Sequence, residues 1–366
     1  MRAALLEKAQ EPLSIVADVE ISDPGPREVV VKVANCGICH SDLSMVDNAG
    51  GTPLPVILGH EAAGVVEAVG TGVTRLAKGD SVMLTPLPPC GHCYYCVRQQ
   101  PTLCVDAQGF MTGTRADGSS PLSRGDATVY RGFGLGGWGE YTVVGENSAI
   151  KIPEDTPLEV ACVIGCAIQT GVGAVLNTAK VEEGATVLVT GLGGIGISIV
   201  QGARLAGASR IIVSDPVPER RDYAANFGAT DILDPGQDDI VARAVELTGG
   251  IGVDYAFDGA GMHELIQQCI QASRIGGTTV MVGAPMDLRP LEIPIPALFL
   301  THEKKVMGSL LGSCHSHRDV PRFLALWRAG KLDLESMVSH RRPVEEVNAG
   351  LDDMRAARGL RTVLSF

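Results

Sequence analysis

Short apolar runs and helical patterns alternate through the second half of the chain. The runs 186–190 and 210–215 centre on Val, Ile and Leu, which is typical of strands buried on both faces of a parallel sheet. Between them, residues 197–208 carry apolar and small side chains at helical spacing. Further helical and strand patterns follow in turn at 219–227, 231–233, 240–247, 253–257, 262–272 and 278–282. This alternation predicts an α/β fold with a doubly wound parallel sheet.

The first part of the chain has a different pattern, in which short strands are separated by many turns. Strand patterns lie at 29–33, 65–69, 81–84 and 141–144, so we expect mainly antiparallel β structure there. A helical pattern at 160–175 leads into the parallel sheet, and the tail has helical patterns at 320–329 and 344–358 before a last strand at 361–366. We expect the tail to return to the first domain, which would then comprise 1–167 and 311–366. The second domain would comprise 168–310.

A glycine-rich turn connects the first strand of the parallel sheet to its helix. In Gly191-Leu-Gly-Gly-Ile-Gly196, Gly191 allows the tight turn, Gly193 lets the backbone approach a pyrophosphate, and Gly196 lets helix and strand pack closely. The free N–H groups of the helix N-terminus then face the phosphates. Asp215 ends the second strand, where an acid binds a ribose 2′-hydroxyl and repels a 2′-phosphate. The pattern predicts a Rossmann-type site for NAD, with Gly194, Ile195 and Arg220 as further cofactor-binding candidates.

Composition restricts the class of partner. The net charge of −12 and the lack of a basic stripe argue against a nucleic-acid partner. The start of the chain has no secretory signal pattern, and no uninterrupted apolar run reaches the length of a membrane span. We therefore expect a cytoplasmic protein with no membrane partner. In a reducing compartment, its ten cysteines are more often thiolates or metal ligands than disulfides.

Four cysteines form a compact quartet, Cys90, Cys93, Cys96 and Cys104. The short spacings fit a tetrahedral Cys₄ zinc site, which would stabilise a loop that has almost no apolar core of its own. An iron–sulfur cluster also takes four thiolates, and four unrelated buried thiols are the plainest alternative. We favour structural zinc because of the ligand type and spacing.

A second candidate metal set consists of Cys39, His60 and Cys166, each in glycine-rich surroundings. Two thiolates and an imidazole form a catalytic zinc set that leaves a fourth position open for water or substrate. Spacing alone does not show that the three meet, since a lone Cys is most often core filler and a lone His is usually satisfied by hydrogen bonds.

The surrounding motifs resemble those of the zinc-dependent medium-chain alcohol dehydrogenases over nearly the whole chain. The resemblance rests on residues 36–42 (CGICHSD), 59–64 (GHEAAG), the cysteine quartet, 165–171 (GCAIQTG), 191–196 (GLGGIG) and 361–366 (RTVLSF). It implies a GroES-like, mainly β catalytic domain interrupted by a Rossmann domain. It also implies NAD and two Zn²⁺ per chain, one catalytic and one structural.

The resemblance implies a role for individual residues. Cys39, His60 and Cys166 would ligate the catalytic zinc, with Glu61 behind the ion. Asp42 would fix the tautomer of His60, and Ser41 would take the proton from the substrate hydroxyl. Thr170, Val282 and Gly283 would contact the nicotinamide, and His40 and Arg361 would face the pyrophosphate. The implied pocket walls are Ser41, Pro86, Leu103 and Phe133, for which ordinary packing is the alternative.

Two features differ among relatives of this kind. Many of them have a histidine three residues after the relay Ser or Thr, and this chain has Ser44 there, so the proton would leave by water, by the cofactor ribose or by another base. The segment 105–137 is long, as in the dimeric branches of the family, which favours a homodimer over a tetramer.

The sequence therefore predicts an enzyme that reversibly oxidises a small alcohol, primary or aromatic, to an aldehyde or ketone. A second possibility is a thiol-dependent enzyme acting on S-hydroxymethyl conjugates of formaldehyde, which would need basic residues near the pocket mouth; Arg115, Arg124 and Arg131 are candidates. A third is a non-catalytic, zinc-stabilised NAD-binding protein, against which the intact ligand set argues. The remaining cysteines, Cys36, Cys162, Cys269 and Cys314, are interpreted as core or incidental thiols.

Overall fold

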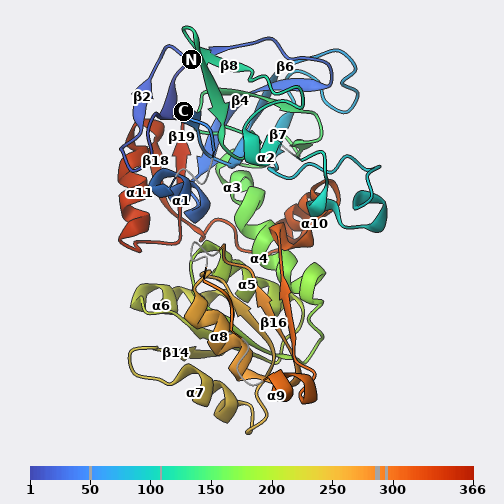
Figure 1. The fold of residues 1–366 in the computed structure, drawn as a ribbon, viewed down its shortest axis with the longest axis vertical. Coiled ribbons are helices and arrows are strands. Elements are labelled where there is room, and N and C mark those ends of the chain that lie inside the picture. Colours follow the sequence, from blue (N-terminus) through green and yellow to red (C-terminus); the bar gives the residue numbers. More distant parts are fainter. Residues whose placement is uncertain (49–51, 108, 285–288, 293–295) are drawn as a thin grey trace. The chain divides into compact units, whose positions relative to one another are not determined.

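A computed structural model of the chain describes residues 1–48, 52–107, 109–284, 289–292 and 296–366. The chain divides into two compact units (Figure 1). The first comprises Met1–Cys166, His315–Arg328 and Leu334–Phe366, and the second comprises Ala167–Cys314 and Ala329–Asp333. The junctions expected at 167/168 and 310/311 thus differ by one and by four residues from the observed ones. The segment 329–333 had been expected in the first domain.

Two mainly antiparallel sheets build the first unit. One has the strand order β11-β7-β6-β4-β19-β18, with β10 also paired to β4, and the other has the order β2-β1-β5-β9-β8-β3. The strands are β1 (Ala3–Leu6), β2 (Ser14–Val16), β3 (Glu20–Ile21), β4 (Glu28–Gly37), β5 (Val56–Ile57), β6 (Glu61–Val69), β7 (Ser81–Leu84), β8 (Leu122–Arg124), β9 (Ala127–Arg131), β10 (Tyr141–Gly145), β11 (Ala149–Lys151), β18 (Val338–Pro343) and β19 (Arg361–Ser365). The pairs β5–β9 and β18–β19 are parallel.

The long strand β4 organises this unit. It continues to Gly37, past the predicted end at Val33, because β6 and β19 both pair along it. Val29, Val30, Val31 and Val33 are buried while Lys32 is exposed, so most of this strand lies within the core. The red C-terminal strand β19 lies within this unit (Figure 1), as expected for the tail, and pairs directly with β4.

The helices of the first unit are α1 (His40–Asn48), α2 (Gly109–Thr112), α3 (Leu158–Val163), α10 (Ser316–Arg328) and α11 (Val347–Arg355). Short 3₁₀ turns lie at Cys96–Arg98, Pro101–Leu103, Gly132–Gly134 and Val344–Glu346. The helix α1 was not predicted, since its sequence is rich in Ser, Asp and Asn and buries only Asp42, Leu43 and Val46. Tertiary packing of those few side chains holds it in place, rather than intrinsic propensity.

The second unit contains a six-stranded sheet of order β14-β13-β12-β15-β16-β17, in which every pair is parallel. Its strands are β12 (Thr186–Thr190), β13 (Arg210–Ser214), β14 (Asp231–Leu233), β15 (Val253–Asp258), β16 (Ser273–Met281) and β17 (Lys305–Gly308). Its helices are α4 (Gln169–Gly173), α5 (Gly194–Leu205), α6 (Pro218–Phe227), α7 (Ile240–Leu247), α8 (His263–Ala272) and α9 (Pro296–Thr301), with a 3₁₀ turn at Leu311–Ser313. The predicted doubly wound fold is confirmed, and the edge strand β17 was missed.

One helical segment bears on the expectation that the protein has no membrane partner. The segment Leu158–Ala179 is continuous, because π-helical turns at Ile164–Ile168 and Ala174–Ala179 join α3 to α4 and extend it. It is long and apolar enough to cross a membrane by length and composition, although no run of that length was recognised in the sequence. However, 83% of its most apolar window is buried inside the protein, which is equally the property of a core helix.

Candidate functional site

Four side chains that could bind a metal meet inside the first unit. Each residue contributes one possible ligand atom, and these atoms all lie within 4.8 Å of one another; the residues are Cys39, His60, Glu61 and Cys166. Cys39 precedes α1, His60 and Glu61 stand at the start of β6, and Cys166 lies in the π-helical turn Ile164–Ile168. Such turns are uncommon and occur often at functional sites. The structure thus brings together the three ligands that the resemblance implied, with Glu61 as a fourth member.

Two glycines make room for this cluster. Gly59 has a φ of +89°, and a Cβ there would run into the indole of the fully buried Trp138. Glycine adopts this backbone conformation without steric cost, so the chain can turn sharply just before His60. Gly37 lies at the end of β4, where a Cβ would overlap the carboxylate of Glu61. The glycine-rich surroundings seen in the sequence therefore have a packing cause.

Asp42 fixes the imidazole of His60. Its Oδ1 lies 3.1 Å from Nδ1 of His60 and accepts from the Gly59 N–H at 3.0 Å, while Oδ2 accepts from the Cys39 N–H at 3.0 Å. With Nδ1 donating to the carboxylate, Nε2 carries the lone pair that a metal needs. Burial opposes protonation of His60, but Asp42 and Cys39 outweigh it and raise its pKa well above the usual value. A hydrogen bond from Cys166, opposed by burial, lowers the pKa of Cys39 well below its usual value.

Glu61 and Arg361 form a fully buried pair beside the cluster. Arg361 Nη1 lies 3.4 Å from Glu61 Oε1 and donates to the Ile38 carbonyl at 2.9 Å. Neither carboxylate oxygen of Glu61 has a hydrogen-bond partner within the described ranges. Burial raises the pKa of Glu61 to about 8, against the opposing charge of Arg361. A buried carboxylate with free lone pairs beside two sulfur ligands and an imidazole fits a bound cation.

The other residues of this region are placed as follows. The Ser41 hydroxyl lies 3.9 Å from Cys39 Sγ and is partly buried, and Ser44 is partly buried on the same helix. His40 is exposed at the start of α1. Arg361 has its guanidinium in the interior of the first unit, against Glu61, and its expected contact with a pyrophosphate stays a prediction. The proton-relay role of Ser41 stays a prediction.

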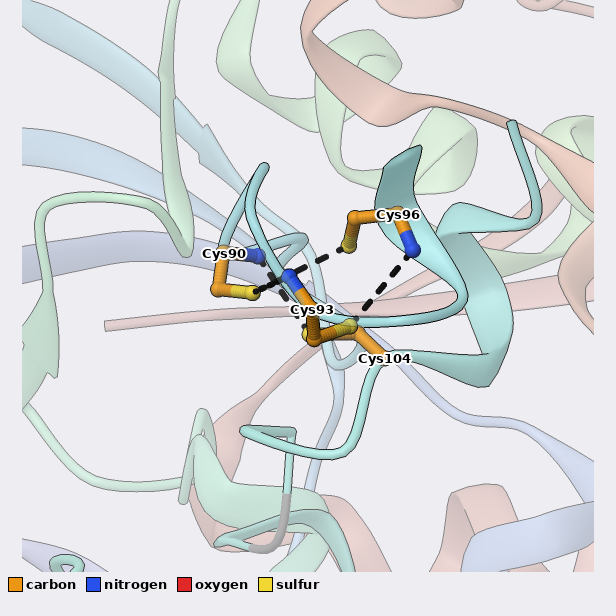
Figure 2. A group of neighbouring side chains, drawn as sticks. All are labelled: Cys90, Cys93, Cys96 and Cys104. Atoms are coloured by element: carbon orange, nitrogen blue, oxygen red, sulfur yellow. Dashed lines mark hydrogen bonds between the residues drawn. The ribbon is translucent and has the colours of Figure 1, made fainter. Parts of the chain in front are cut away.

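The cysteine quartet also converges, and Figure 2 shows its four side chains pointing toward one another. The Sγ atoms of Cys90 and Cys96 are 3.9 Å apart and those of Cys93 and Cys104 are 4.0 Å apart, far beyond a disulfide bond length. Backbone N–H groups donate to these sulfurs, for example from Cys90 to Cys104 at 3.3 Å and from Cys96 to Cys93 at 3.5 Å. Such bonds from the backbone of Cys96 and of Val105 lower the pKa of Cys93 to about 6. Burial raises the pKa of Cys90, Cys96 and Cys104, so Cys93 is the one sulfur of the four at which the backbone donors outweigh burial and favour the thiolate.

In the second unit, the predicted glycine turn connects β12 to α5. Gly191 has a φ of +81°, and a Cβ on Gly196 would overlap the Gly191 carbonyl. A Cβ on Gly193 would meet no atom within 4 Å, so this side of the turn is open to a ligand. Gly194 and Ile195 form the first turn of α5. These features match the reasons for which glycines were expected at the three positions.

Asp215 follows β13 and is buried. Its Oδ2 accepts from the Leu192 N–H at 2.7 Å and its Oδ1 accepts from the Val217 N–H at 2.8 Å. Arg220 Nη1 is 4.0 Å from Oδ2, and Arg221 donates to the Asp215 carbonyl at 2.7 Å. The acid therefore holds the glycine turn in place in addition to any contact with a ribose.

Sequence reasoning missed Asp258, at the carboxyl end of β15. Its two oxygens accept from Ala260 N–H at 3.1 Å and Gly261 N–H at 2.9 Å, and its carbonyl accepts from the N–H groups of Val282 and Gly283, both at 3.0 Å. Burial raises the pKa of Asp258 to about 6, although the backbone donors oppose this. The signal was present, since an acid ends a buried parallel strand here. Thr170, the remaining nicotinamide candidate, is buried in α4.

A cavity of about 330 Å³ lies in the first unit and includes two of the four predicted pocket residues, Pro86 and Phe133. The Phe133 ring also packs against the His60 ring, with 4.4 Å between centroids. Ser41 and Leu103 are not among the residues that line this cavity, and the side chain of Leu103 is 46% exposed. The prediction for Leu103 therefore has no support from this cavity. The cysteines interpreted as core thiols, Cys36, Cys162, Cys269 and Cys314, are all buried, and none of them forms a disulfide bond.

Two family models match the chain. Residues 25–154 match the alcohol dehydrogenase GroES-like domain, and residues 194–328 match the zinc-binding dehydrogenase model. The chain belongs to the zinc-dependent medium-chain alcohol dehydrogenase family. It is thus an oxidoreductase of the zinc alcohol dehydrogenase type, a family that acts on small molecules with a nicotinamide cofactor.

Solved structures agree with this assignment. An alcohol dehydrogenase zinc-binding domain protein from Burkholderia ambifaria is 36% identical, with a TM-score of 0.94, and the match covers 100% of this chain and 98% of that one. Benzyl alcohol dehydrogenase from Acinetobacter calcoaceticus is 31% identical, with a TM-score of 0.93 and coverage of 100% and 99%. A putative zinc-binding dehydrogenase from Sinorhizobium meliloti, bound to NADP, is 27% identical, with a TM-score of 0.81 and coverage of 100% and 99%.

Proposed function

We propose that this dehydrogenase oxidises primary or aromatic alcohols reversibly to the aldehyde or ketone, with NAD as the hydride acceptor and with zinc at Cys39, His60 and Cys166. The convergence of these three ligand atoms and of Glu61 within 4.8 Å carries the proposal. The similarity to a benzyl alcohol dehydrogenase supports the aromatic class of substrate. A second zinc ion at the cysteine quartet and a homodimeric assembly complete the proposal.

The donor set suits zinc, which when bound supplies a Lewis acid that acidifies a coordinated hydroxyl and polarises a carbonyl. The protein's own contribution is positional. Asp42 accepts the Nδ1 proton of His60, which leaves Nε2 as the nitrogen that can bind a metal. The hydroxyl of Ser41, 3.9 Å from Cys39 Sγ, would accept the proton of an alcohol held at the cluster and pass its own proton to water, to the cofactor ribose or to another base. Glu61 offers a carboxylate that can balance charge at the cluster.

NAD is favoured over NADP by Asp215. A buried carboxylate that ends β13 would repel a 2′-phosphate and accept a hydrogen bond from a 2′-hydroxyl. Arg220 opposes this preference, because its guanidinium lies 4.0 Å from the same carboxylate and could attract a phosphate. Because one similar structure holds NADP, both cofactors belong in the first assay.

The hypothesis of a thiol-dependent formaldehyde dehydrogenase needs basic residues near the pocket mouth, and the three candidate arginines support it only in part. Arg124 is engaged by Asp18 and Glu7 on the surface, and Arg115 forms a bidentate pair with Glu28. Only Arg131 has no carboxylate in hydrogen-bond contact within the described ranges. A requirement for a thiol cofactor in the assay would favour that reading over the simple alcohol.

The test is formation of NADH from NAD⁺ across primary, secondary and aromatic alcohols and thiol–formaldehyde adducts, with NADP⁺ in parallel and with zinc content measured. We expect turnover of primary or aromatic alcohols with NAD⁺. The Cys39→Ser variant should lose this turnover, and its zinc content should fall by about one ion per chain. Zinc-replete protein that turns over none of these substrates would contradict the proposal and favour a non-catalytic NAD-binding role. An unchanged zinc content in Cys39→Ser would contradict the assignment of the metal site.

A further inference from the structure

The cavity behind Phe133 contains a buried cation that the proposed reaction does not use. This cation is Arg131, the last residue of β9, which is only 4% exposed and lines the cavity. Its Nη1 donates to the Val143 carbonyl, but its Nε has no hydrogen-bond partner among the residues that the structure describes. A buried guanidinium with an unused donor is costly unless something else satisfies it.

The nearest charges do not fully compensate Arg131. Glu28 also lines the cavity, but Arg115 takes both of its oxygens, with Nε to Oε1 at 2.9 Å and Nη2 to Oε2 at 2.8 Å. Glu28 therefore interacts with Arg131 only by long-range electrostatic attraction, without a hydrogen bond. Asp106 is a second lining carboxylate, but its side chain is 54% exposed and lies 3.6 Å from Nε2 of His92, so solvent screens it. The interior thus holds two guanidinium groups and one carboxylate.

Arg131 nevertheless keeps its charge. Burial lowers its pKa to about 10, with Glu28 opposing and Arg115 adding to the effect. The group is therefore a cation at neutral pH, and the cavity has one buried positive charge in excess. A guanidinium fork is the natural partner of a carboxylate, which it binds through two parallel N–H donors.

The rest of the cavity is suited to a flat apolar group. Phe110 and Phe133 both line it, with ring centroids 5.4 Å apart and planes inclined by 54°. Pro86, Pro88 and Leu135 add further apolar wall. A volume of about 330 Å³ is at the lower end of the range of small-molecule pockets. Phe133 connects this cavity to the metal cluster, since it lines the cavity and its ring also contacts the ring of His60.

We propose that the cavity binds an aromatic carboxylate, with the carboxylate on Arg131 and the ring packed against the pair Phe110 and Phe133. The carboxylate can belong to the substrate, which would then be an aromatic alcohol or aldehyde with an acidic group at its far end, or to a separate aromatic acid. The substrate form rests on the function proposed above, whereas binding itself does not.

Binding is tested first, without turnover. Titration calorimetry compares benzoate with the neutral isostere benzamide on zinc-replete protein and on Cys39→Ser, because a carboxylate could otherwise coordinate the catalytic zinc. We expect benzoate to bind both proteins and to bind at least about tenfold more tightly than benzamide. Benzoate that binds no better than benzamide, or that binds only the protein with intact Cys39, would overturn the proposal.

Variants locate the site. Arg131→Lys keeps the charge but loses the planar fork, and we expect it to weaken benzoate binding about tenfold or more. Arg124→Gln is the matched control, since Arg124 is on the neighbouring strand, is paired with Asp18 and Glu7, and does not line the cavity. Should Arg131→Lys not fold, Phe110→Ala removes one wall and must weaken benzoate and benzamide alike. Unchanged benzoate affinity in the folded variant would overturn the assignment.

The source of the carboxylate is decided by kinetics. If it belongs to the substrate, 4-(hydroxymethyl)benzoate should exceed benzyl alcohol in kcat/KM by about tenfold or more, and Arg131→Lys should remove the advantage. If it belongs to a separate acid, the two alcohols should be equal and added benzoate should change the kinetics of benzyl alcohol through Arg131. If no alcohol is oxidised while benzoate still binds through Arg131, the proposed reaction fails and the carboxylate site stands.

Discussion

Arg361 and Glu61 face each other inside the first unit, with Nη1 and Oε1 3.4 Å apart and both side chains at most 4% exposed. The two residues are 300 positions apart in the chain, and the pairing of β19 with β4 and of β4 with β6 brings them together. The C-terminal strand therefore supplies the only counter-charge that the described residues show in an ion pair with Glu61.

Removing one member of this pair should be strongly destabilising. Above about pH 8, where Glu61 is ionised in the wild type, Arg361→Met would leave its carboxylate buried beside Cys39 without its cation, and we expect a loss of about 3–5 kcal/mol in the free energy of unfolding. Urea unfolding of zinc-replete protein measures it. The double variant Glu61→Gln/Arg361→Met should recover most of the lost stability. Arg358→Met is the surface control: the exposed side chain of Arg358 pairs with Asp353, and its removal should cost about 1 kcal/mol or less. A loss below about 1 kcal/mol for Arg361→Met would show that the pair is not needed.

Asp42 should control metal affinity through His60. Asp42→Asn keeps the shape but removes the charge that holds the Nδ1 proton, so zinc affinity should fall about 10–100-fold. Competition with a chromophoric chelator measures the affinity. Asp47→Asn is the control on the same helix, because Asp47 pairs with Arg355 at the surface. Equal affinities in the two variants would argue that the Asp42–His60 contact does not tune the site.

The cysteine quartet should hold its own ion, independent of the first cluster. Cys93→Ser should reduce the zinc content by about one ion per chain and make the loop susceptible to proteolysis, since little apolar packing supports it. Atomic emission and limited proteolysis measure the two effects. Tyr94→Phe is the control, because Tyr94 is an exposed residue of the same loop and belongs to none of the possible metal-binding groups of the described residues. A Cys93→Ser protein that keeps two ions and resists protease would refute the structural site.

Asp258 should make stability depend on pH in a specific direction. Its pKa is about 6 in the folded protein and about 4 in the unfolded chain, so the unfolded chain loses its proton first as pH rises. The contribution to stability is therefore present at low pH and is lost as pH rises from about 4 to 6 and beyond. Between pH 5 and 7 the unfolding free energy of the wild type should fall, relative to Asp258→Asn, by on the order of 1 kcal/mol. A difference that stays constant over this range would contradict the prediction.

Local patterns in the sequence were sufficient for much of the fold. The bounds predicted for β12, β14 and α7 are those observed, because apolar runs between turn residues specify buried strands and helices without reference to distant segments. The glycine turn and the cysteine quartet were also identified from spacing alone, since each is a compact stretch whose chemistry depends on neighbouring residues.

Features that depend on distant partners could not be predicted in this way. The helix α1 has little intrinsic propensity, and β4 is longer than its pattern because strands from two other regions pair with it. The contact of Arg361 with Glu61 joins two strands that are far apart in the chain, so no local pattern indicated it. In the sequence, Arg131 was one of three candidate basic residues near the pocket mouth. That its Nε is buried without a hydrogen-bond partner among the described residues is seen only in the structure.

By itself the sequence determined the class of fold, the positions of the glycine turn and the quartet, and, through its motifs, the family. Tertiary structure alone decided that Cys39, His60 and Cys166 meet, that Asp42 orients the imidazole, and that Arg131 is buried in a cavity without an acid of its own. The reason is physical: hydrophobic periodicity and turn chemistry act over a few residues, whereas burial and the pairing of charges depend on which strands become neighbours.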